Sequence, residues 1–176
     1  KELEARRQEI RREKLSRKTL GAERGGLAKG VRVKGMDDLL IRFSKCCTPV
    51  PGDDIIGYVT RGRGVSVHRT DCPNIVSLSQ SPQRCLPVEW ISIEDASYPV
   101  EIQVEAVDRV NLLASIMNAV SEQKTNIEAV NARTTKERVA HVSLVVDIHD
   151  IDHMQAVIDR IKRVDGVVDA HRAYPT

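Results

Sequence analysis

Four residues in the middle of the chain combine metal-binding side chains at close spacing. Cys46 and Cys47 are adjacent, and after twenty further residues come His68 and Cys72, with three residues between them. Thiolate sulfur and imidazole nitrogen are the ligands that Zn²⁺ prefers, and four of them complete a closed tetrahedral site. The adjacent cysteines depart from the roughly two to four residues that usually separate paired zinc ligands. We predict a zinc site at these four residues and expect Cys85 to serve packing only.

Two other interpretations of the same residues remain open. The cysteines could be buried, reduced thiols beside a hydrogen-bonded His68, because adjacent α-carbons lie ~3.8 Å apart and a disulfide usually needs ~4.4–6.8 Å. Alternatively, Cys47 or Cys72 could be a nucleophile with His68 as its base. The sequence offers no obvious third orienting group, P-loop, His-Asp metal pair or catalytic carboxylate pair. We therefore expect this segment to be non-catalytic.

Basic side chains flank the cysteines in the sequence. Arginine and lysine bind phosphate groups, and an arginine on a glycine-rich turn can approach a nucleic-acid backbone closely. The predicted RNA-binding residues are Arg42, Lys45, Arg61, Arg63 and Arg69. The alternative is ordinary solvated surface charge. Tyr58 and Trp90 could stack on bases, but we expect core packing for both.

A third candidate site lies where the first strand of the C-terminal unit meets its helix. A helix N-terminus with free N–H groups can hold a carboxylate or a phosphate. Asp108, Arg109 and Asn111 are therefore candidate ligand-binding residues. Simple capping of the helix by Asp108 is the alternative that we favour.

Two units precede the C-terminal one. The pattern of residues 1–30 predicts a charged helical connector, which has Glu–Arg pairs at helical spacing and is followed by a glycine-rich linker. Residues 31–93 predict a small Cys-rich β/α unit of the zinc-finger type. Its predicted elements are strands at 55–60, 65–68 and 87–93 and a short helix from Cys72. Because this unit has few large apolar residues, we expect it to need a bound metal ion for stable folding.

The C-terminal unit, residues 97–173, has the clearest periodicity. Apolar and polar residues alternate in four predicted strands, at 100–106, 126–134, 138–148 and 167–173. In the second strand we expect Ile127, Ala129 and Asn131 on one face. Two predicted helices lie between the strands, and Asp150 is placed to cap the second. The order βαββαβ describes a ferredoxin-like fold with two helices on one face of an antiparallel sheet, so the predicted fold class is α+β.

Composition limits the class of protein further. The 176 residues are 41% hydrophobic and 30% charged, which suits one or two small cores. No apolar run approaches the ~18 residues of a membrane helix and no secretory signal opens the chain, so we expect a cytoplasmic protein with no membrane partner. The first residue is Lys1 rather than Met, which indicates a segment of a longer protein. Net charge is +7 over residues 1–45, zero over 46–90 and −5 over 91–176. This gradient is typical of a chain whose two ends have different neighbours, but from charge alone we favour a solvated helix joined to an ordinary acidic domain.

The segment around the cysteines resembles one family closely. It reads KCCTPVPGDDIIGY at 45–58 and GRGVSVHR at 62–69, followed by Cys72-Pro73, and is similar to the C-terminal regulatory region of the long RelA/SpoT-type stringent-response enzymes. The next unit resembles the ACT domain that ends those proteins, through Asp108-Arg109, Leu112-Leu113 and Thr125-Asn126-Ile127. Cys46, Cys47, His68 and Cys72 match the zinc ligands proposed for the family.

The resemblance implies a function for the whole parent protein. Family members make the alarmone (p)ppGpp from ATP and GDP or GTP as GTP pyrophosphokinases, and many also hydrolyse it. Their catalytic domains, with Mg or Mn, precede this region. The resemblance further implies that this region docks on a ribosome that holds an uncharged tRNA, with both units against rRNA. The ACT unit would offer a second docking surface or a homodimer face.

A second interpretation is an amino-acid-sensing ACT domain attached to another enzyme. ACT domains that bind amino acids usually place Gly where Asn111 stands, because the ligand approaches the backbone there. Asn111 brings a side chain into that space, and this departure speaks against amino-acid sensing.

Overall fold

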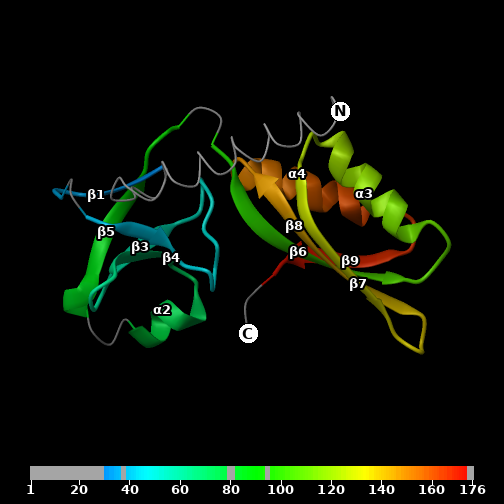
Figure 1. Cartoon of the computed structure of the whole chain (residues 1–176), viewed down its shortest axis with the longest axis horizontal. Coiled ribbons are helices and arrows are strands. Elements are labelled where there is room, and N and C mark those ends of the chain that lie inside the picture. The colour runs from blue at the N-terminus through cyan, green and yellow to red at the C-terminus, as the bar shows by residue number, and fades with distance from the viewer. Residues whose placement is uncertain (1–29, 37–38, 79–81, 94–95, 174–176) are drawn as a thin grey trace, which may run out of the picture.

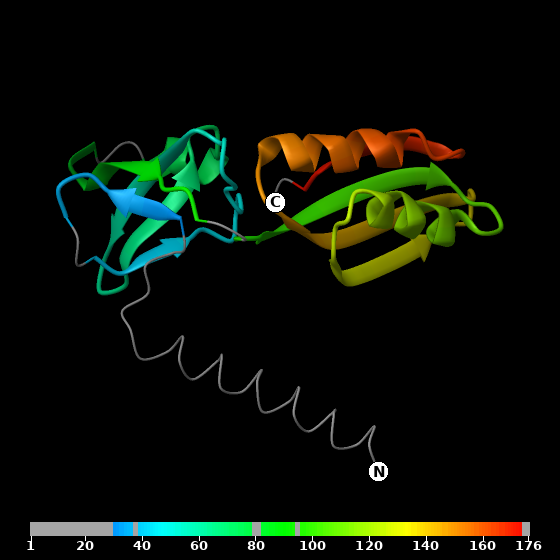
Figure 2. The ribbon, with the colours of Figure 1, turned by 90° about the horizontal axis from the view of Figure 1, so that it is seen from above.

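The computed structural model describes residues 30–36, 39–78, 82–93 and 96–173. The helical connector and glycine-rich linker predicted at residues 1–30 lie outside the described residues, except for Gly30. The described chain is α+β and contains two sheets, of five and four strands, which lie side by side along the long axis of the molecule (Figures 1 and 2). The predicted fold class is therefore confirmed.

The first sheet belongs to the Cys-rich unit and has the strand order β1-β5-β3-β4-β2. Its elements are β1 (Val31–Val33), β2 (Ile41–Phe43), β3 (Ile55–Thr60), β4 (Gly64–Arg69), α2 (Pro73–Leu78), the short 3₁₀ helix η1 (Pro82–Arg84) and β5 (Cys85–Trp90). β2 and β4 run parallel, whereas the other neighbours are antiparallel. The strand predicted at 87–93 instead covers Cys85–Trp90. Its pairing begins where Cys85 lies opposite Tyr58 on β3 and ends where Trp90 lies opposite Val31 on β1.

The hairpin between β3 and β4 depends on the glycine that ends its turn. Gly64 has φ +77°, and a Cβ there would lie 2.1 Å from the carbonyl oxygen of Leu40. The amide of Val65 also donates to that oxygen at 2.8 Å. Glycine therefore allows the hairpin to lie against the start of β2, which brings the segment with Cys46 and Cys47 beside β4.

The second sheet is the predicted ferredoxin-like unit, with the strand order β7-β8-β6-β9 and antiparallel neighbours throughout. Its elements are β6 (Tyr98–Val107), α3 (Leu112–Glu122), β7 (Ile127–Thr134), β8 (Val139–Ile148), α4 (Ile151–Lys162) and β9 (Val167–Arg172). Every second residue of β6 and β8 is buried. These residues form one core with the buried faces of both helices.

The two helix starts in this unit differ from each other. Asp150 caps α4 as predicted, because its carboxylate accepts the amide of His153 at 2.7 Å. The cap predicted at Asp108 is wrong. Its amide donates to the carbonyl of Arg138, which keeps Asp108 at the end of the sheet, and the helix begins four residues later, at Leu112. Asn111 is the N-cap of α3, with φ 65° and no side-chain cap.

The predicted faces of β7 also need correction. Ile127 pairs with Val146, which is buried, whereas Ala129 pairs with Val145 on the opposite face of the sheet. An irregularity between Ile127 and Ala129 shifts the register, as a β-bulge does. Ile127 therefore packs against the core, whereas Ala129 and Asn131 lie on the face away from the helices.

The loop that follows Cys47 packs between the two units. Val50 has no exposed surface and belongs to the core of the second unit. The amide of Ile151, at the start of α4, donates to the carbonyl of Pro51 at 2.9 Å. Beside the loop, the rings of Phe43, Trp90 and Tyr98 pack together with centroids 5.6–5.7 Å apart. The two units therefore share a packed junction.

Gly52 provides a test of this junction. Gly52 and Gly62 both have positive φ, so alanine at either costs about 1–2 kcal/mol through backbone strain. Only at Gly52 would the new Cβ meet a neighbour, at 2.5 Å from Cγ2 of Ile151. We expect Gly52→Ala to lower the free energy of unfolding in urea by clearly more than the control Gly62→Ala. Equal losses would contradict close packing of this loop on α4.

Candidate metal centre

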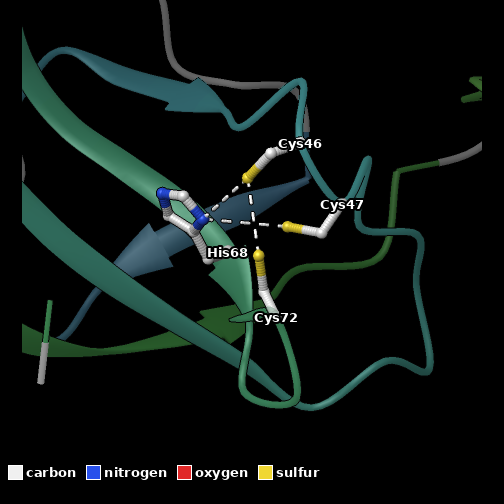
Figure 3. Close-up of side chains that lie close together, drawn as sticks. All are labelled: Cys46, Cys47, His68 and Cys72. Carbon is white, nitrogen blue, oxygen red and sulfur yellow. Dashed lines mark hydrogen bonds between the residues drawn. The ribbon is translucent and has the colours of Figure 1, made fainter. Parts of the chain in front are cut away.

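Three segments bring the four predicted ligands together (Figure 3). Cys46 and Cys47 lie in the turn after β2, His68 lies near the end of β4, and Cys72 lies immediately before α2. One ligand atom from each of the four falls within 4.8 Å of all the others. Residues 26 positions apart therefore meet at one point, as the motif predicts.

Local backbone structure explains this convergence. β2 pairs with β4 in parallel, and the amide of Ser44 continues the ladder by donating to the carbonyl of Val67. Alternation along β4 buries Val67 in the core of its sheet and turns Ser66 and His68 the other way. A turn then closes from the amide of Cys72 to the carbonyl of Arg69, which returns the third thiol to the imidazole.

The distances between ligand atoms fit a four-coordinate ion. Sγ of Cys46 lies 3.3 Å from Nδ1 of His68 and 3.5 Å from Sγ of Cys72. Sγ of Cys47 lies 3.8 Å from the same imidazole nitrogen. A tetrahedron with zinc–sulfur and zinc–nitrogen bonds of ordinary length has edges of about 3.5–3.8 Å. The cluster can hold a metal, and its donor set of three thiols and one imidazole is compatible with Zn²⁺.

Polar neighbours orient the ligands. Ser66 Oγ lies 3.3 Å from Nε2 of His68, so the imidazole uses one nitrogen for a hydrogen bond and turns the other to the thiols. Ser44 Oγ lies 2.8 Å from Sγ of Cys46, and the amide of Arg69 donates to Sγ of Cys47 at 3.3 Å. Partners of this kind fix the orientation of metal ligands.

The two adjacent thiols have different environments. Burial raises the pKa of Cys47 to about 12, although the Arg69 amide opposes the shift. For Cys46, burial also raises the pKa, but hydrogen bonds from Asn74, Ser44 and the neighbouring thiols outweigh it and leave the pKa below its ordinary value. Burial lowers the pKa of His68, which favours the neutral imidazole that binds metals.

Cys85 lies outside the ligand set. It pairs with Tyr58 across β3 and β5 and packs, partly buried, beside the cluster, as predicted. Tyr58 is buried as well, and Trp90 stacks on Phe43 while its Nε1 donates to the carbonyl of Asp53. Both aromatic residues thus serve packing.

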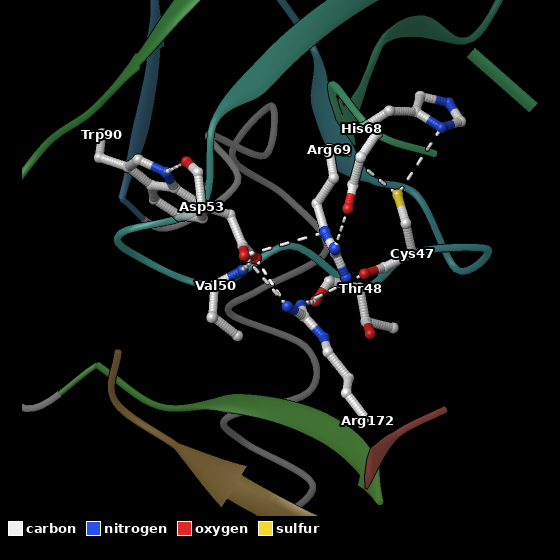
Figure 4. A network of polar contacts seen from close by, with 9 residues as sticks. Cys47, Thr48, Val50, Asp53, His68, Arg69, Trp90 and Arg172 are labelled. Atoms are coloured by element: carbon white, nitrogen blue, oxygen red, sulfur yellow. Dashed lines mark hydrogen bonds and ion pairs between the residues drawn. The ribbon is translucent and has the colours of Figure 1, made fainter. Parts of the chain in front are cut away.

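A buried ion pair connects the second unit to the loop at residues 47–53, which we call the ligand loop (Figure 4). Nη1 of Arg172, on β9, donates to both carboxylate oxygens of Asp53, at 2.9 and 3.1 Å. Its Nη2 donates to the carbonyl oxygens of Cys47, at 3.2 Å, and Thr48. The carboxylate also accepts the amide of Val50 at 2.8 Å, and Arg69 Nε lies 3.8 Å away.

Sequence reasoning missed Asp53 and Arg172. Asp53 follows a Pro-Gly turn and reads as an ordinary turn residue. Arg172 carries the detectable signal, since it stands two residues after the buried Ala170 and shares its inward face of β9. A charged residue at an inward position requires a partner, although the sequence does not indicate which one.

The predicted RNA-binding residues occupy different environments. Arg61 and Arg63 are exposed at the β3–β4 turn, Arg42 is exposed on the edge strand β2, and Lys45 is exposed beside the ligands. Arg69 differs, because 13% of its side chain is exposed and it pairs with Asp53 and Asp71.

The third candidate site forms a loop braced across the second unit. Nε of Arg109 donates to the carbonyl of Asp165 at 2.9 Å, and its Nη2 lies 3.4 Å from Ser115 Oγ. Asn111 has the left-handed backbone that glycine adopts most readily and that asparagine tolerates. Asp108 lies beside them at the end of β6. Within the part of the chain that the structure describes, no helix is long and apolar enough to cross a membrane.

Comparison with known proteins identifies both units. Residues 31–91 match the family model of the RelA/SpoT RIS domain, and residues 94–172 match that of an ACT domain. The fold and the metal cluster therefore belong to a RIS domain joined to an ACT domain.

Similar curated proteins carry consistent names. The GTP pyrophosphokinase of Streptomyces coelicolor is 45% identical over 142 residues, covering 81% of this chain and 17% of that protein. The bifunctional (p)ppGpp synthase/hydrolase RelA of Mycobacterium tuberculosis is 43% identical, covering 81% of this chain and 19% of that protein. The GTP pyrophosphokinase of Escherichia coli is 34% identical, covering 82% and 20%. The chain thus spans a fifth or less of each of these three relatives. It belongs to the RelA/SpoT family and is a regulatory part of a RelA-type enzyme.

The environments of the adjacent thiols predict unequal reactivity. Because the thiolate is the nucleophile, the lowered pKa of Cys46 and the raised pKa of Cys47 favour alkylation of Cys46 at neutral pH. We expect iodoacetamide to modify Cys46 first in the metal-stripped chain, as measured by fragmentation mass spectrometry of the peptide that contains both. Denatured chain serves as the control, in which the preference should vanish. Faster modification of Cys47 would contradict these assigned environments.

Proposed function

We propose that this chain docks its parent enzyme on the stalled ribosome and thereby controls alarmone synthesis. The observation that carries the proposal is the match of residues 31–91 to the RIS domain, whose name points to the ribosome, together with its buried four-ligand cluster. The parent is then a cytoplasmic enzyme that makes (p)ppGpp from ATP and GDP or GTP in domains outside this chain. Its signal is an uncharged tRNA in the ribosomal A site.

The metal in this proposal is Zn²⁺ in a structural role. Three thiols and an imidazole come from the protein, which fills four positions and leaves none for a substrate. The ion would join the turn after β2 to β4 and to the start of α2. The Cys-rich unit needs such a link because its buried apolar residues form only small groups, one of them around the cysteines. Metal binding would therefore contribute directly to folding.

Electrostatic contact with RNA is the second part of the proposal. Arg61 and Arg63 are exposed at the end of a rigid hairpin, where they can reach phosphates without distorting the sheet. Arg42 and Lys45 extend the basic surface along β2 toward the metal cluster. Arg69 lies at the opposite end of β4 from the hairpin turn, where it pairs with Asp53 and Asp71.

The ACT domain offers a second contact despite its negative charge. Residues 91–176 have a net charge of −5, but the end of β7 and the turn that follows it carry three exposed basic residues. These are Arg133, Lys136 and Arg138. They would meet RNA as a local basic patch on an acidic domain. β7 is also an edge strand of its sheet, which suits the proposed homodimer contact.

Zinc binding is tested by elemental analysis of the purified chain. We expect about one zinc per chain, since four protein ligands hold a single ion. Cys72→Ser should reduce the content below about half, because it removes a buried ligand. Cys85→Ser is the matched control and should retain the metal, because Cys85 lies outside the ligand set. Equal zinc in all three proteins, or none in the unmodified chain, would remove the metal from the proposal.

Ribosome docking is tested by co-sedimentation with and without uncharged tRNA. Arg61→Gln with Arg63→Gln should weaken binding and lower the salt dependence by about one unit of slope per lost phosphate contact. The matched control is Arg32→Gln with Lys34→Gln, which removes the same charge on and directly after the edge strand β1. If the chain does not pellet with ribosomes at low salt, docking is wrong. If both double variants bind equally, the assigned surface is wrong.

A further inference from the structure

We propose that Arg172 of the ACT domain is a positioning residue of the metal centre, so that metal affinity in the RIS domain depends on the ACT domain. This inference rests on the metal binding proposed above. The side chain of Arg172 leaves β9 and lies under the ligand loop, with 6% of its surface exposed (Figure 4). Its guanidinium group contacts three residues of that loop, which are Cys47, Thr48 and Asp53.

The first contact acts directly on a metal ligand. Cys47 has its carbonyl oxygen bound by Arg172 and its Sγ bound by the amide of Arg69. Two hydrogen bonds from different domains therefore fix the backbone and the thiol of one residue. Without the first, the Cys47 peptide could rotate and move its sulfur away from His68.

The second contact holds a strained backbone. Thr48 has φ 36°, in the left-handed region that a β-branched residue rarely adopts. Its amide donates to the carbonyl of Ser44, and its own carbonyl accepts from Arg172. A residue in this conformation persists where its surroundings determine it. Arg172 is one of the groups that surround Thr48. It therefore stabilises the sharp turn from Ser44 to Thr48 that contains the two cysteines.

The third contact joins the chain beside the ligand His68 to the same network. The Asp53 carboxylate lies between Arg172 and Arg69, and Arg69 directly follows the ligand His68. The same carboxylate accepts the amide of Val50 and so closes the loop. One buried charge pair thus connects β9 of the ACT domain with the chain beside three ligands, Cys46, Cys47 and His68.

The domains have further contacts that do not involve Arg172. Val50 lies in the ACT core, and Ile151 donates to Pro51. These contacts keep the domains together when Arg172 is replaced, so the effect on the metal can be separated from undocking. By linkage, metal binding must in turn tighten the ACT side of the junction by the same factor.

The first experiment measures Zn²⁺ affinity of the full chain by competition with a chelating dye. Arg172→Gln should bind zinc about 10- to 100-fold more weakly, as is typical when a group that orients ligands is removed. Arg172→Lys keeps the charge but offers one donor centre for three acceptor residues. The zinc affinity of this variant should therefore lie between those of the unmodified chain and Arg172→Gln. Arg160→Gln is the matched control, because Arg160 pairs with Glu122 inside the ACT domain, and it should match the unmodified chain.

A double variant tests whether the ion pair carries the effect. Asp53→Asn should weaken zinc binding as Arg172→Gln does, and the two together should be no worse than the stronger single change. If the losses of zinc affinity in the two single variants add up in the double variant, Arg172 does not act through Asp53. That result would overturn the proposed role of the ion pair. Near-ultraviolet circular dichroism of Trp90, at the junction, checks that each variant remains folded and docked.

A measurement on the unmodified chain needs no substitution. Zinc should slow hydrogen exchange of the Ile151 amide, which bonds to Pro51 across the junction, by about 5- to 150-fold. The Thr135 amide, in the distant β7–β8 turn, should not change. Unchanged exchange at Ile151, or equal zinc affinity of Arg172→Gln and Arg160→Gln, overturns the inference and leaves zinc binding intact. If the unmodified chain binds no zinc, both the proposed metal and this inference fall.

Discussion

The Asp53–Arg172 ion pair is the interaction on which the rest of the structure depends. Both side chains are 6% exposed, so neither charge can return to water without opening the junction. Removing one partner of a buried pair leaves an uncompensated charge, which costs about 3–5 kcal/mol in typical proteins. Because the same guanidinium also binds two carbonyls of the ligand loop, the pair ties the junction of the domains to the backbone of Cys47.

The small RIS core explains why such an arrangement is needed. Its apolar residues form one group around Val31 and Val67 and another around the cysteines, and the buried Val50 packs instead with the ACT domain. Burial alone gives a unit of this size little stability. A metal cluster on one side and a neighbouring domain on the other supply the missing contacts. The ACT domain, with a continuous core between one sheet and two helices, provides the more rigid support.

Short-range patterns predicted most of the fold and the four metal ligands. Alternation of apolar and polar residues located β6 and β8, because each of these strands has one buried face. The failures have physical causes. Asp108 has the chemistry of a cap, but its amide is bound to Arg138 and the helix starts later. The β7 bulge moves Ile127 to another face, and no periodicity reveals one inserted residue. The partnership of Asp53 with Arg172 spans 119 positions, which no local pattern can report.

The ligand loop gives the two domains different boundaries in sequence and in space. Along the chain the change of domain lies near residue 94, yet Val50 contributes to the ACT core and Arg172 to the RIS loop. Each domain therefore carries a part that functions only in its neighbour. An ACT domain grafted onto this RIS domain would have to bring a cation on β9 to pair with Asp53. We expect these two positions to be inherited as a pair, so that a lineage which changes one also changes the other.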